Sequence, residues 1–478
     1  MKILHISAEC YPAAKAGGLG DVAGALPKYL NQVGADTAVV IPKYQTKWLN
    51  KQSYQEVYRG TIQLRHEHFV FAIEKVVNDD LGFPLYVANI PGKFDRPGIY
   101  QDPSGYSYGD ELQRALSFQI AVLHWLRWMD QKPEILHCHD HHTGLIPFLV
   151  KYAYDFNSLK DIPTIFTIHN GVYHGAFSWG NMGLLPAFDS YAGGLLDWED
   201  KINPLASAIK CCWKLTTVSP SYMDELRTRS NGLEWLLNNE RGKSIGILNG
   251  IDTQVWNPKT DPLIDTHLGR SISKYKEANK KVLFERFSHL QPNLPIFTFI
   301  GRLVYEKGAD LIPDVVSRFL YDGHRANFII LGTGMPRLHH VFANMREHFK
   351  GFFDASLEYN ETLAHQLYAG SDFLLMPSRV EPCGLNQMYS MRYGTVPVVR
   401  SIGGLKDTVL DIGETEGRGI RFNQLSVDDG YMSLIRGVNI YNDKKAFNAL
   451  LKRITKLDFS WEKSAEAYHY LYKELGLS

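Results

Sequence analysis

Short apolar runs, rich in β-branched residues, alternate with longer segments of helical periodicity along most of the chain. Runs of this kind separated by helix-length segments indicate βαβ units and a parallel sheet that is buried on both faces. The predicted strands cover residues 2–7, 37–41, 134–138, 164–168 and 214–218, then 296–300, 327–331, 373–376 and 396–399. The pattern therefore predicts an α/β fold.

A strand followed by a glycine-rich turn occurs twice, once in each half of the chain. The two occurrences read ILHIS with GGLGD, and IFTFIGRL with KG. Because 478 residues exceed the size at which single cores stop growing, about 250–300 residues, two domains are expected. We predict two doubly wound, Rossmann-like domains over residues 1–248 and 249–457, joined at NGIDTQVWNP, a segment that suits a hinge. Since such sheets bind ligands beyond the carboxyl ends of their strands, we expect the catalytic cleft between the domains.

The last segment, residues 458–478, carries apolar and aromatic side chains at helical spacing, among them Trp461, Tyr468 and Leu471. This periodicity predicts a terminal amphipathic helix. Its apolar face must be covered by another part of the protein.

Composition and charge narrow the classes of partner. The chain has 51 basic and 51 acidic residues, which argues against a nucleic-acid or anionic-membrane partner. The five cysteines show no paired spacing, so a disulfide framework is not expected. We find no signal peptide and no apolar run near the ~18 residues of a membrane span, and we expect a soluble, cytoplasmic protein. The sequence does not specify an oligomeric state.

The motif KAGGLGDV, residues 15–22, follows the first predicted strand. Glycines allow backbone N–H groups to approach an anion, the start of a helix favours negative charge, and Lys15 adds a cation. A tight turn with a solvated lysine is the alternative. The spacing matches neither the dinucleotide fingerprint nor the Walker A loop, so an NAD-linked oxidoreductase and a P-loop ATPase are not supported.

In the second half, GRLVYEKG places Arg302 and Lys307 just after a predicted strand, and EPCGLNQMYSMRYG places Glu381 after another. A guanidinium and an ammonium on one loop can neutralise a diphosphate without a metal. A carboxylate at a strand end can hold sugar hydroxyls. The alternatives are exposed charges and an ordinary carboxylate at a helix start.

The histidine-rich segment HCHDHHTG, residues 137–144, resembles a metal cluster only at first sight. Alternate strand residues point to opposite faces, so His137 and His139 cannot share a face with Cys138. We expect no metal here and treat Asp140 as either a sugar-facing carboxylate or a structural strand end. His169 and Asn170 end the next predicted strand and are candidates for the same site.

These motifs together resemble the bacterial glycogen synthase and plant starch synthase family, retaining glucosyltransferases of the GT-B fold. The resemblance covers nearly the whole chain and rests on KAGGLGDV, HCHDHHTGL, TIHNGVYHG, LTTVSPSY, GILNGID, GRLVYEKG, YAGSDFLLMPSRVEPCGLNQMYSMRYGTVPVVR and FSWEKSAEAY. It implies transfer of glucose from ADP-glucose to the non-reducing end of an α-1,4-glucan such as glycogen, without metal or cofactor. It also implies that the last helix crosses back to the N-terminal domain.

The resemblance implies a role for each candidate residue. Lys15, Gly17 and Gly18, with Asp21 in the same motif, would meet the distal phosphate and the sugar. Arg302 and Lys307 would hold the diphosphate, while the donor glucose and phosphates would meet Glu381, Cys383, Gly384 and Leu385. His169 would lie beside the reacting centre. The cleft would be lined by Asp140, Asn170 and Asn249, and the nucleotide base would lie near Tyr100 and Tyr359.

Three positions bear on this resemblance. His141 stands where the family commonly has tryptophan, and Ala206 where it has lysine; both bear on acceptor handling. Tyr389 lies eight positions after Glu381, where the wider GT-B transferases have glutamate, and this agrees with the glycogen synthases.

Retention by two carboxylates requires a nucleophile about 5 Å from the acid, and the motif loops offer no such pair. We therefore expect the leaving diphosphate to accept the proton of the acceptor hydroxyl, with front-side attack through an oxocarbenium-like transition state. Two alternatives stay open: a UDP-glucose-dependent α-glucosyltransferase, and a catalytically silent glucan-binding regulatory protein on the same fold.

Overall fold

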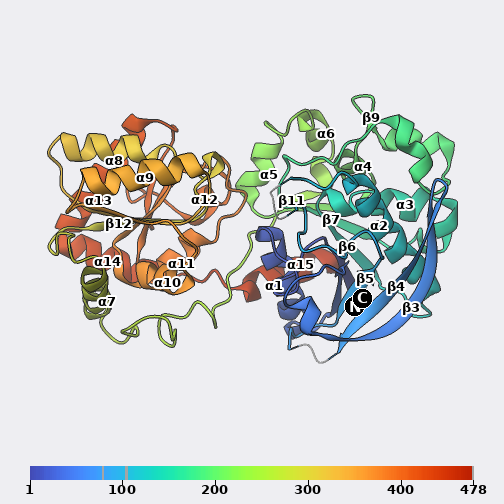
Figure 1. Ribbon diagram of the computed structural model, residues 1–478, viewed down its shortest axis with the longest axis horizontal. Coiled ribbons are helices and arrows are strands. Elements are labelled where there is room, and N and C mark those ends of the chain that lie inside the picture. Colours follow the sequence, from blue (N-terminus) through green and yellow to red (C-terminus); the bar gives the residue numbers. More distant parts are fainter. Residues whose placement is uncertain (78–79, 103–105, 476–478) are drawn as a thin grey trace. The chain divides into compact units, whose positions relative to one another are not determined.

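The computed structural model describes residues 1–77, 80–102 and 106–475. The chain divides into two compact units, Met1–Leu248 with Trp461–Ser478, and Asn249–Ser460 (Figure 1). Each unit is an α/β layer structure around its own sheet. Within the described residues, no helix combines the length and the apolar character needed to cross a membrane.

The sheet of the first unit has the strand order β11-β10-β7-β6-β1-β2-β5-β4-β3. Its strands from β11 to β5 pair in parallel. Their bounds are β1 Lys2–Ile6, β2 Asp36–Pro42, β5 Leu85–Asn89, β6 Ile135–His139, β7 Thr164–Ile168, β10 Lys214–Thr217 and β11 Ser244–Gly246. The strands predicted for this half are present, with bounds that differ by one residue at most.

One edge of this sheet is an antiparallel arm that the sequence did not predict. The strands β3 Ser53–Leu64 and β4 Glu67–Val77 form a long antiparallel pair, and β4 pairs antiparallel with β5. Most of the side chains of β3 are exposed or half-buried. Such an edge strand needs no continuous apolar run. The pattern that identifies buried parallel strands therefore does not detect it.

Helices surround this sheet, and the last helix of the chain is one of them. They are α1 Gly18–Gln32, α2 Glu111–Trp128, α3 Ile146–Tyr152, α4 Pro204–Cys211, α5 Pro220–Leu226, α6 Glu234–Asn239 and α15 Trp461–Lys473. Helix α15 lies beside α1 (Figure 1) and buries Trp461, Tyr468 and Tyr472 in one cluster with Leu26 and Tyr29. The hydroxyl of Tyr472 also lies 2.8 Å from Nδ1 of His137.

The sheet of the second unit has the order β14-β13-β12-β15-β16-β17, and every strand pair that the structure describes in it is parallel. The strands are β12 Ile296–Ile300, β13 Asn327–Leu331, β14 Phe353–Ser356, β15 Phe373–Met376, β16 Val396–Arg400 and β17 Ile420–Phe422. The helices are α7 Ile272–Arg286, α8 Ile312–Tyr321, α9 Pro336–His348, α10 Glu361–Gly370, α11 Asn386–Arg392, α12 Gly403–Thr408, α13 Val427–Asn442 and α14 Lys444–Ile454. Helices α8 and α9 lie on one side of the sheet, and α10 and α11 on the other (Figure 1).

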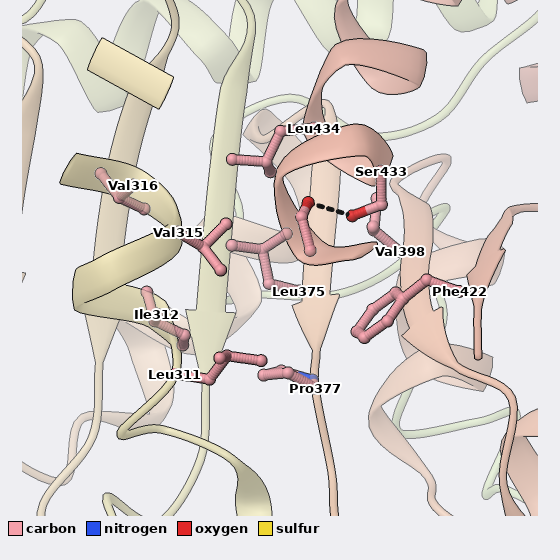
Figure 2. Close-up of a pocket in the computed structure, with 11 residues that line it drawn as sticks. Leu311, Ile312, Val315, Val316, Leu375, Pro377, Val398, Phe422, Ser433 and Leu434 are labelled. Atoms are coloured by element: carbon pink, nitrogen blue, oxygen red, sulfur yellow. Dashed lines mark hydrogen bonds between the residues drawn. The ribbon is translucent and has the colours of Figure 1, made fainter. Parts of the chain in front are cut away.

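A small apolar cavity of about 30 Å³ lies between α8, α13 and the sheet of the second unit (Figure 2). Leu311 and Pro377 lie at one end of it, and its polar neighbour, the Ser433 hydroxyl, donates to the carbonyl of Gly430. Because its walls offer no charged group, this cavity is a packing gap rather than a site for a phosphate or a sugar.

The segment NGIDTQVWNP, expected to act as a hinge, is packed on the second unit over much of its length. The indole of Trp256 stacks between the rings of His365 and Tyr389, with ring centroids at 4.0 and 3.9 Å. The guanidinium of Arg392 donates to the carbonyls of Trp256 and Thr253. These contacts fix residues 253–256 to the second unit.

We predict that the buried face of α15 is required for the stability of the first unit. Tyr468→Ala removes a side chain with no exposed surface and should lower the free energy of unfolding by about 3–5 kcal/mol, the cost of truncating a large buried aromatic residue. Tyr470, on the same helix, is 69% exposed, so Tyr470→Ala should change stability by less than about 0.5 kcal/mol. Denaturant unfolding of both variants compares the two faces; equal effects would contradict the docking role.

Candidate functional site

A buried carboxylate organises the glycine-rich loop of the first unit. Glu9, just after β1, is 3% exposed. Its Oε2 accepts hydrogen bonds from the N–H groups of Ala16 (2.6 Å) and Gly17 (2.8 Å), and its Oε1 accepts from the Tyr100 hydroxyl (2.7 Å). The Gly17 N–H therefore donates to Glu9 and is not free for an outside anion. From the sequence we expected the N–H groups of this loop to be available to an anion. Glu9 was not predicted from the sequence, although a lone acidic residue just after an apolar strand is a recognisable signal.

The two glycines at the start of α1 border open space. A Cβ atom placed on Gly17 or Gly18 would meet no described atom within 4 Å, and Gly17 has an extended backbone that any residue can adopt. The protein's own packing therefore does not require glycine at these positions. The space they leave lies beside the N-terminus of a 15-residue helix, an environment that favours anions.

Lys15 and Asp21 form an ion pair beside this loop. The ammonium of Lys15 lies 2.6 Å from Oδ1 of Asp21, and the Lys15 side chain is largely exposed. Burial raises the pKa of Asp21, and the charge of Lys15 opposes that shift. Lys15 is therefore a cation at the surface of the loop, but one that already has a carboxylate partner.

Asp140 joins the ends of the neighbouring strands β6 and β7. Its Oδ1 accepts hydrogen bonds from the N–H groups of His169 (2.7 Å) and Asn170 (3.4 Å). Its φ of +56° is in the left-handed region that residues other than glycine seldom adopt, which is typical of strained positions at functional sites. Burial raises the pKa of the Asp140 carboxyl to about 7, while the N–H groups of His169 and Asn170 act against the shift.

His169 is the end of a row of buried imidazoles. Its Nε2 lies 3.0 Å from Nδ1 of His139, whose Nε2 lies 3.0 Å from Nδ1 of His5. Burial lowers the pKa of His169 to about 3 and that of His5 to about 3. His169 is therefore neutral near pH 7 and offers a hydrogen-bonding group rather than a positive charge.

In the second unit, a glycine turn brings Lys307 to the end of β15. Gly308 has φ +68°, and a Cβ there would lie 1.9 Å from the carbonyl oxygen of Pro377, so only glycine allows this approach. The ammonium of Lys307 contacts both carboxylate oxygens of Glu381, at 2.7 and 2.8 Å. The hydroxyl of Ser378 donates to the same carboxylate at 2.9 Å. Glu381 is 6% exposed, so these are the donors that compensate its burial.

Arg302 differs from Lys307 in its surroundings, although the sequence placed them on one loop. The Arg302 side chain is 65% exposed, and its guanidinium is 3.4 Å from the carboxylate of Glu306. Lys307 is mostly buried and fully paired. The loop thus presents one open cation and one cation that is neutralised within the protein.

The remaining candidates of the second unit lie around the start of α11. Gly384 has φ +73°, and a Cβ there would lie 2.5 Å from Oε1 of Gln387. Burial raises the pKa of the Cys383 thiol to about 12, so it is not a thiolate. Asn249 is buried, and its Oδ1 has no hydrogen-bond partner among the described residues. Leu385 directly precedes α11.

Tyr100 and Tyr359, both expected near the nucleotide base, occupy different environments. Tyr100 belongs to the first unit, where it bonds to Glu9 and stacks on His142 with a centroid distance of 4.9 Å. Tyr359 belongs to the second unit and is 83% exposed in the loop before α10. Because the two tyrosines belong to different units, neither unit alone contains both of them.

The three family-related positions have different surroundings. Ala206 is completely buried in α4, so its side chain cannot contact an acceptor. Tyr389 packs on Trp256. His141 lies against Gly175, where a Cβ would approach the imidazole to 2.7 Å.

Comparisons with known proteins cover nearly the whole chain. Residues 2–239 match the family model described as starch synthase catalytic domain, and residues 283–417 match glycosyl transferases group 1. A glycogen synthase of Flavobacterium johnsoniae is 48% identical over 99% of this chain and 98% of its own length. One of Streptococcus sanguinis is 36% identical over 99% of this chain and all of its own length.

Solved structures show the same similarity. The catalytic domain of starch synthase IV from Arabidopsis thaliana, bound to ADP and acarbose, superposes with a TM-score of 0.85 at 32% identity over 99% of this chain and 98% of that one. A sucrose-phosphate synthase from Thermosynechococcus elongatus shares the fold, with a TM-score of 0.60 at 14% identity over 99% of this chain and 98% of that one.

We predict that Lys307 and Arg302 differ in their effect on stability. Lys307→Ala leaves the nearly buried Glu381 carboxylate without its cation and should cost about 1–3 kcal/mol. Arg302→Ala removes an exposed cation with a weak partner and should cost less than about 1 kcal/mol. Thermal and denaturant unfolding measure both. A Lys307→Ala protein as stable as the wild type would show that water replaces the ammonium without cost.

We predict a pH-dependent contribution of Asp140 to stability. Its folded pKa of about 7 is above its ordinary value of 3.8, so the stabilisation is full below pH 4 and is lost as the pH rises to 7. Asp140→Asn keeps an oxygen acceptor for the two N–H groups but does not ionise. Its stability relative to the wild type should therefore increase from pH 5 to pH 8. Denaturant unfolding at both values tests this; a constant difference would contradict it.

Proposed function

This chain belongs to the glycogen synthase and starch synthase family, and we propose that it transfers glucose from ADP-glucose to the non-reducing end of an α-1,4-glucan, with retention. The observation that carries the proposal is similarity over the full length, 48% identity to a glycogen synthase covering 99% of the chain. ADP and acarbose, a nucleotide and an oligosaccharide analogue, are bound in the related Arabidopsis structure.

In the second unit we assign the donor to the loops at the ends of β12 and β15. Arg302 is open to solvent, and its forked guanidinium suits a diphosphate. Lys307 would exchange part of its interaction with Glu381 for a phosphate oxygen, and the Glu381 carboxylate would then be available to sugar hydroxyls. Cys383, Gly384 and Leu385 would contribute backbone groups, because the Cys383 thiol is neutral and buried.

In the first unit we assign the distal phosphate and the transferred glucose to the loop around Lys15. The open space at Gly17 and Gly18 beside the start of α1 supports this assignment. His169, neutral and held by Asp140 and His139, would hydrogen-bond the sugar near the reacting carbon. We propose that the two sets of residues act on one donor.

The carboxylates of these loops support a mechanism without a protein nucleophile. Glu9 and Asp140 are bound by backbone N–H groups, and Glu381 by Lys307. We propose that the glycosidic oxygen leaves with the diphosphate, whose oxygen accepts the proton of the attacking 4-hydroxyl on the same face of the sugar. Arg302, Lys307 and Lys15 stabilise the negative charge that develops on the leaving group.

The test is incorporation of labelled glucose into glycogen from ADP-glucose and, separately, from UDP-glucose, each with and without excess EDTA. We expect ADP-glucose to be the better donor and transfer to persist in EDTA, because protein cations act where a metal would otherwise act. A preference for UDP-glucose would support the alternative transferase. No transfer from either donor, with glucan binding retained, would support the regulatory protein.

We predict that Arg302→Ala lowers turnover by about 10²-fold or more, the scale of losing one preorganised stabiliser of developing charge. Arg346→Ala is a matched control, since Arg346 is a half-exposed arginine of the same unit, on α9. Turnover should be normal in the control, and the free energy of unfolding should change by less than about 1 kcal/mol in both. A near-normal rate in Arg302→Ala would show that this arginine has no role in the transfer.

A further inference from the structure

Three potential metal ligands gather in the first unit outside the residues assigned to transfer. Glu111 is the first residue of α2, and His141 and His142 begin the short 3₁₀ segment His141–Thr143 after Asp140. One ligand atom from each residue lies within 4.8 Å of the other two. Glu111 is exposed and both histidines are half-buried, so the group is open to solvent.

The two imidazoles have ring contacts with the rest of the protein, but the three side chains have no hydrogen-bond partner among the described residues. No described residue forms a hydrogen bond with the Glu111 carboxylate or with the ring nitrogens of His141 and His142, and Nδ1 of His142 is buried without a partner. A second group, His5, His137 and His139, is also close-packed but fully buried. Its nitrogens bond to one another, to His169, to Tyr472 and to Thr167, so binding there would break existing bonds.

Ring stacking presents the edges of the two free imidazoles. The His141 and His142 rings lie 3.8 Å apart between centroids, and His142 also stacks on Tyr100. Tyr100 therefore covers one face of His142, whereas the nitrogens of both imidazoles lie on the ring edges.

Two charged side chains bear on the group, the Arg114 guanidinium and the Glu111 carboxylate. Arg114 is the cation that acts on His142, but its guanidinium is fixed by the carbonyls of Lys93 and Ile99. The Glu111 carboxylate offsets that charge. Two imidazoles with one carboxylate suit Zn²⁺, Co²⁺ or Ni²⁺, whereas Mg²⁺ and Ca²⁺ prefer oxygen ligands.

Although the sequence of residues 137–144 led us to expect no metal there, we propose that Glu111, His141 and His142 form a binding site for a divalent transition metal ion of the Zn²⁺ type, with water completing the coordination. Zinc–ligand bonds of about 2.0–2.2 Å require the three ligand atoms to lie close together. Rotation of the exposed Glu111 side chain can bring its carboxylate closer to the two imidazoles. The bound ion would join the first turn of α2 to the segment after β6. The three ligands are not among the residues that we assign to the donor, and the proposal does not depend on the proposed function.

The test uses full-length protein without a polyhistidine tag, stripped with EDTA and then dialysed. Calorimetry with Zn²⁺ should show one site per chain, and Co²⁺ should give a visible spectrum of nitrogen and oxygen ligation. Glu111→Gln should weaken binding at least tenfold and His141→Ala should abolish it. Glu361→Gln is the matched control, because Glu361 is likewise an exposed first residue of a helix, and it should bind as the wild type does.

Zn²⁺ should also raise the melting temperature of the wild type and of Glu361→Gln, but much less that of Glu111→Gln. The proposal is overturned if the wild type binds no Zn²⁺, if Glu111→Gln binds it with unchanged affinity, or if the Co²⁺ spectrum shows thiolate ligation. Metal-free Glu111→Gln should transfer glucose at the wild-type rate. A protein inactive with every donor would leave the binding measurement interpretable, so the two proposals fail separately.

Discussion

Carboxylates held away from water fix the loops on which both units build their candidate sites. A buried carboxylate is costly unless donors surround it, so each one selects a single arrangement of its loop. Glu9 gathers two N–H groups of the glycine loop and the Tyr100 hydroxyl, and Glu381 gathers Lys307 and Ser378. The loops therefore have their conformation before any substrate binds, and this lowers the entropic cost of binding.

The same interactions decide which positive charges are available. Lys15 and Lys307 each have a carboxylate partner at 2.6–2.7 Å, whereas Arg302 has a longer contact and an exposed side chain. Under the proposed assignment, a diphosphate would meet Arg302 directly but would compete with Asp21 and Glu381 for the two ammonium groups. The same competition would weaken the attraction of these residues for other anions.

The fold was largely predictable because buried parallel strands have a strong sequence signature. Short runs rich in Ile, Leu and Phe located β7, β12, β13 and β15 to the residue. The arm formed by β3 and β4 was not predicted, because its exposed side chains follow no apolar pattern. Among the candidate residues, the motifs pointed to Lys15, Arg302 and Glu381, but the role of Glu9 and the pairing of Lys307 with Glu381 arise from contacts between segments far apart in sequence. Spacing along the chain does not encode such contacts.

Helix α15 follows the second unit in sequence but packs in the core of the first unit, so the two units complete their cores in a different order from their synthesis. The core that Trp461, Tyr468 and Tyr472 share with Leu26 and Tyr29 is incomplete until residues beyond 460 have left the ribosome. Residues 249–460 form a compact unit of their own and emerge earlier. The first unit to be synthesised is therefore the last to complete its core, and its apolar surface beside α1 must stay exposed, or be shielded by a chaperone, while the second unit folds.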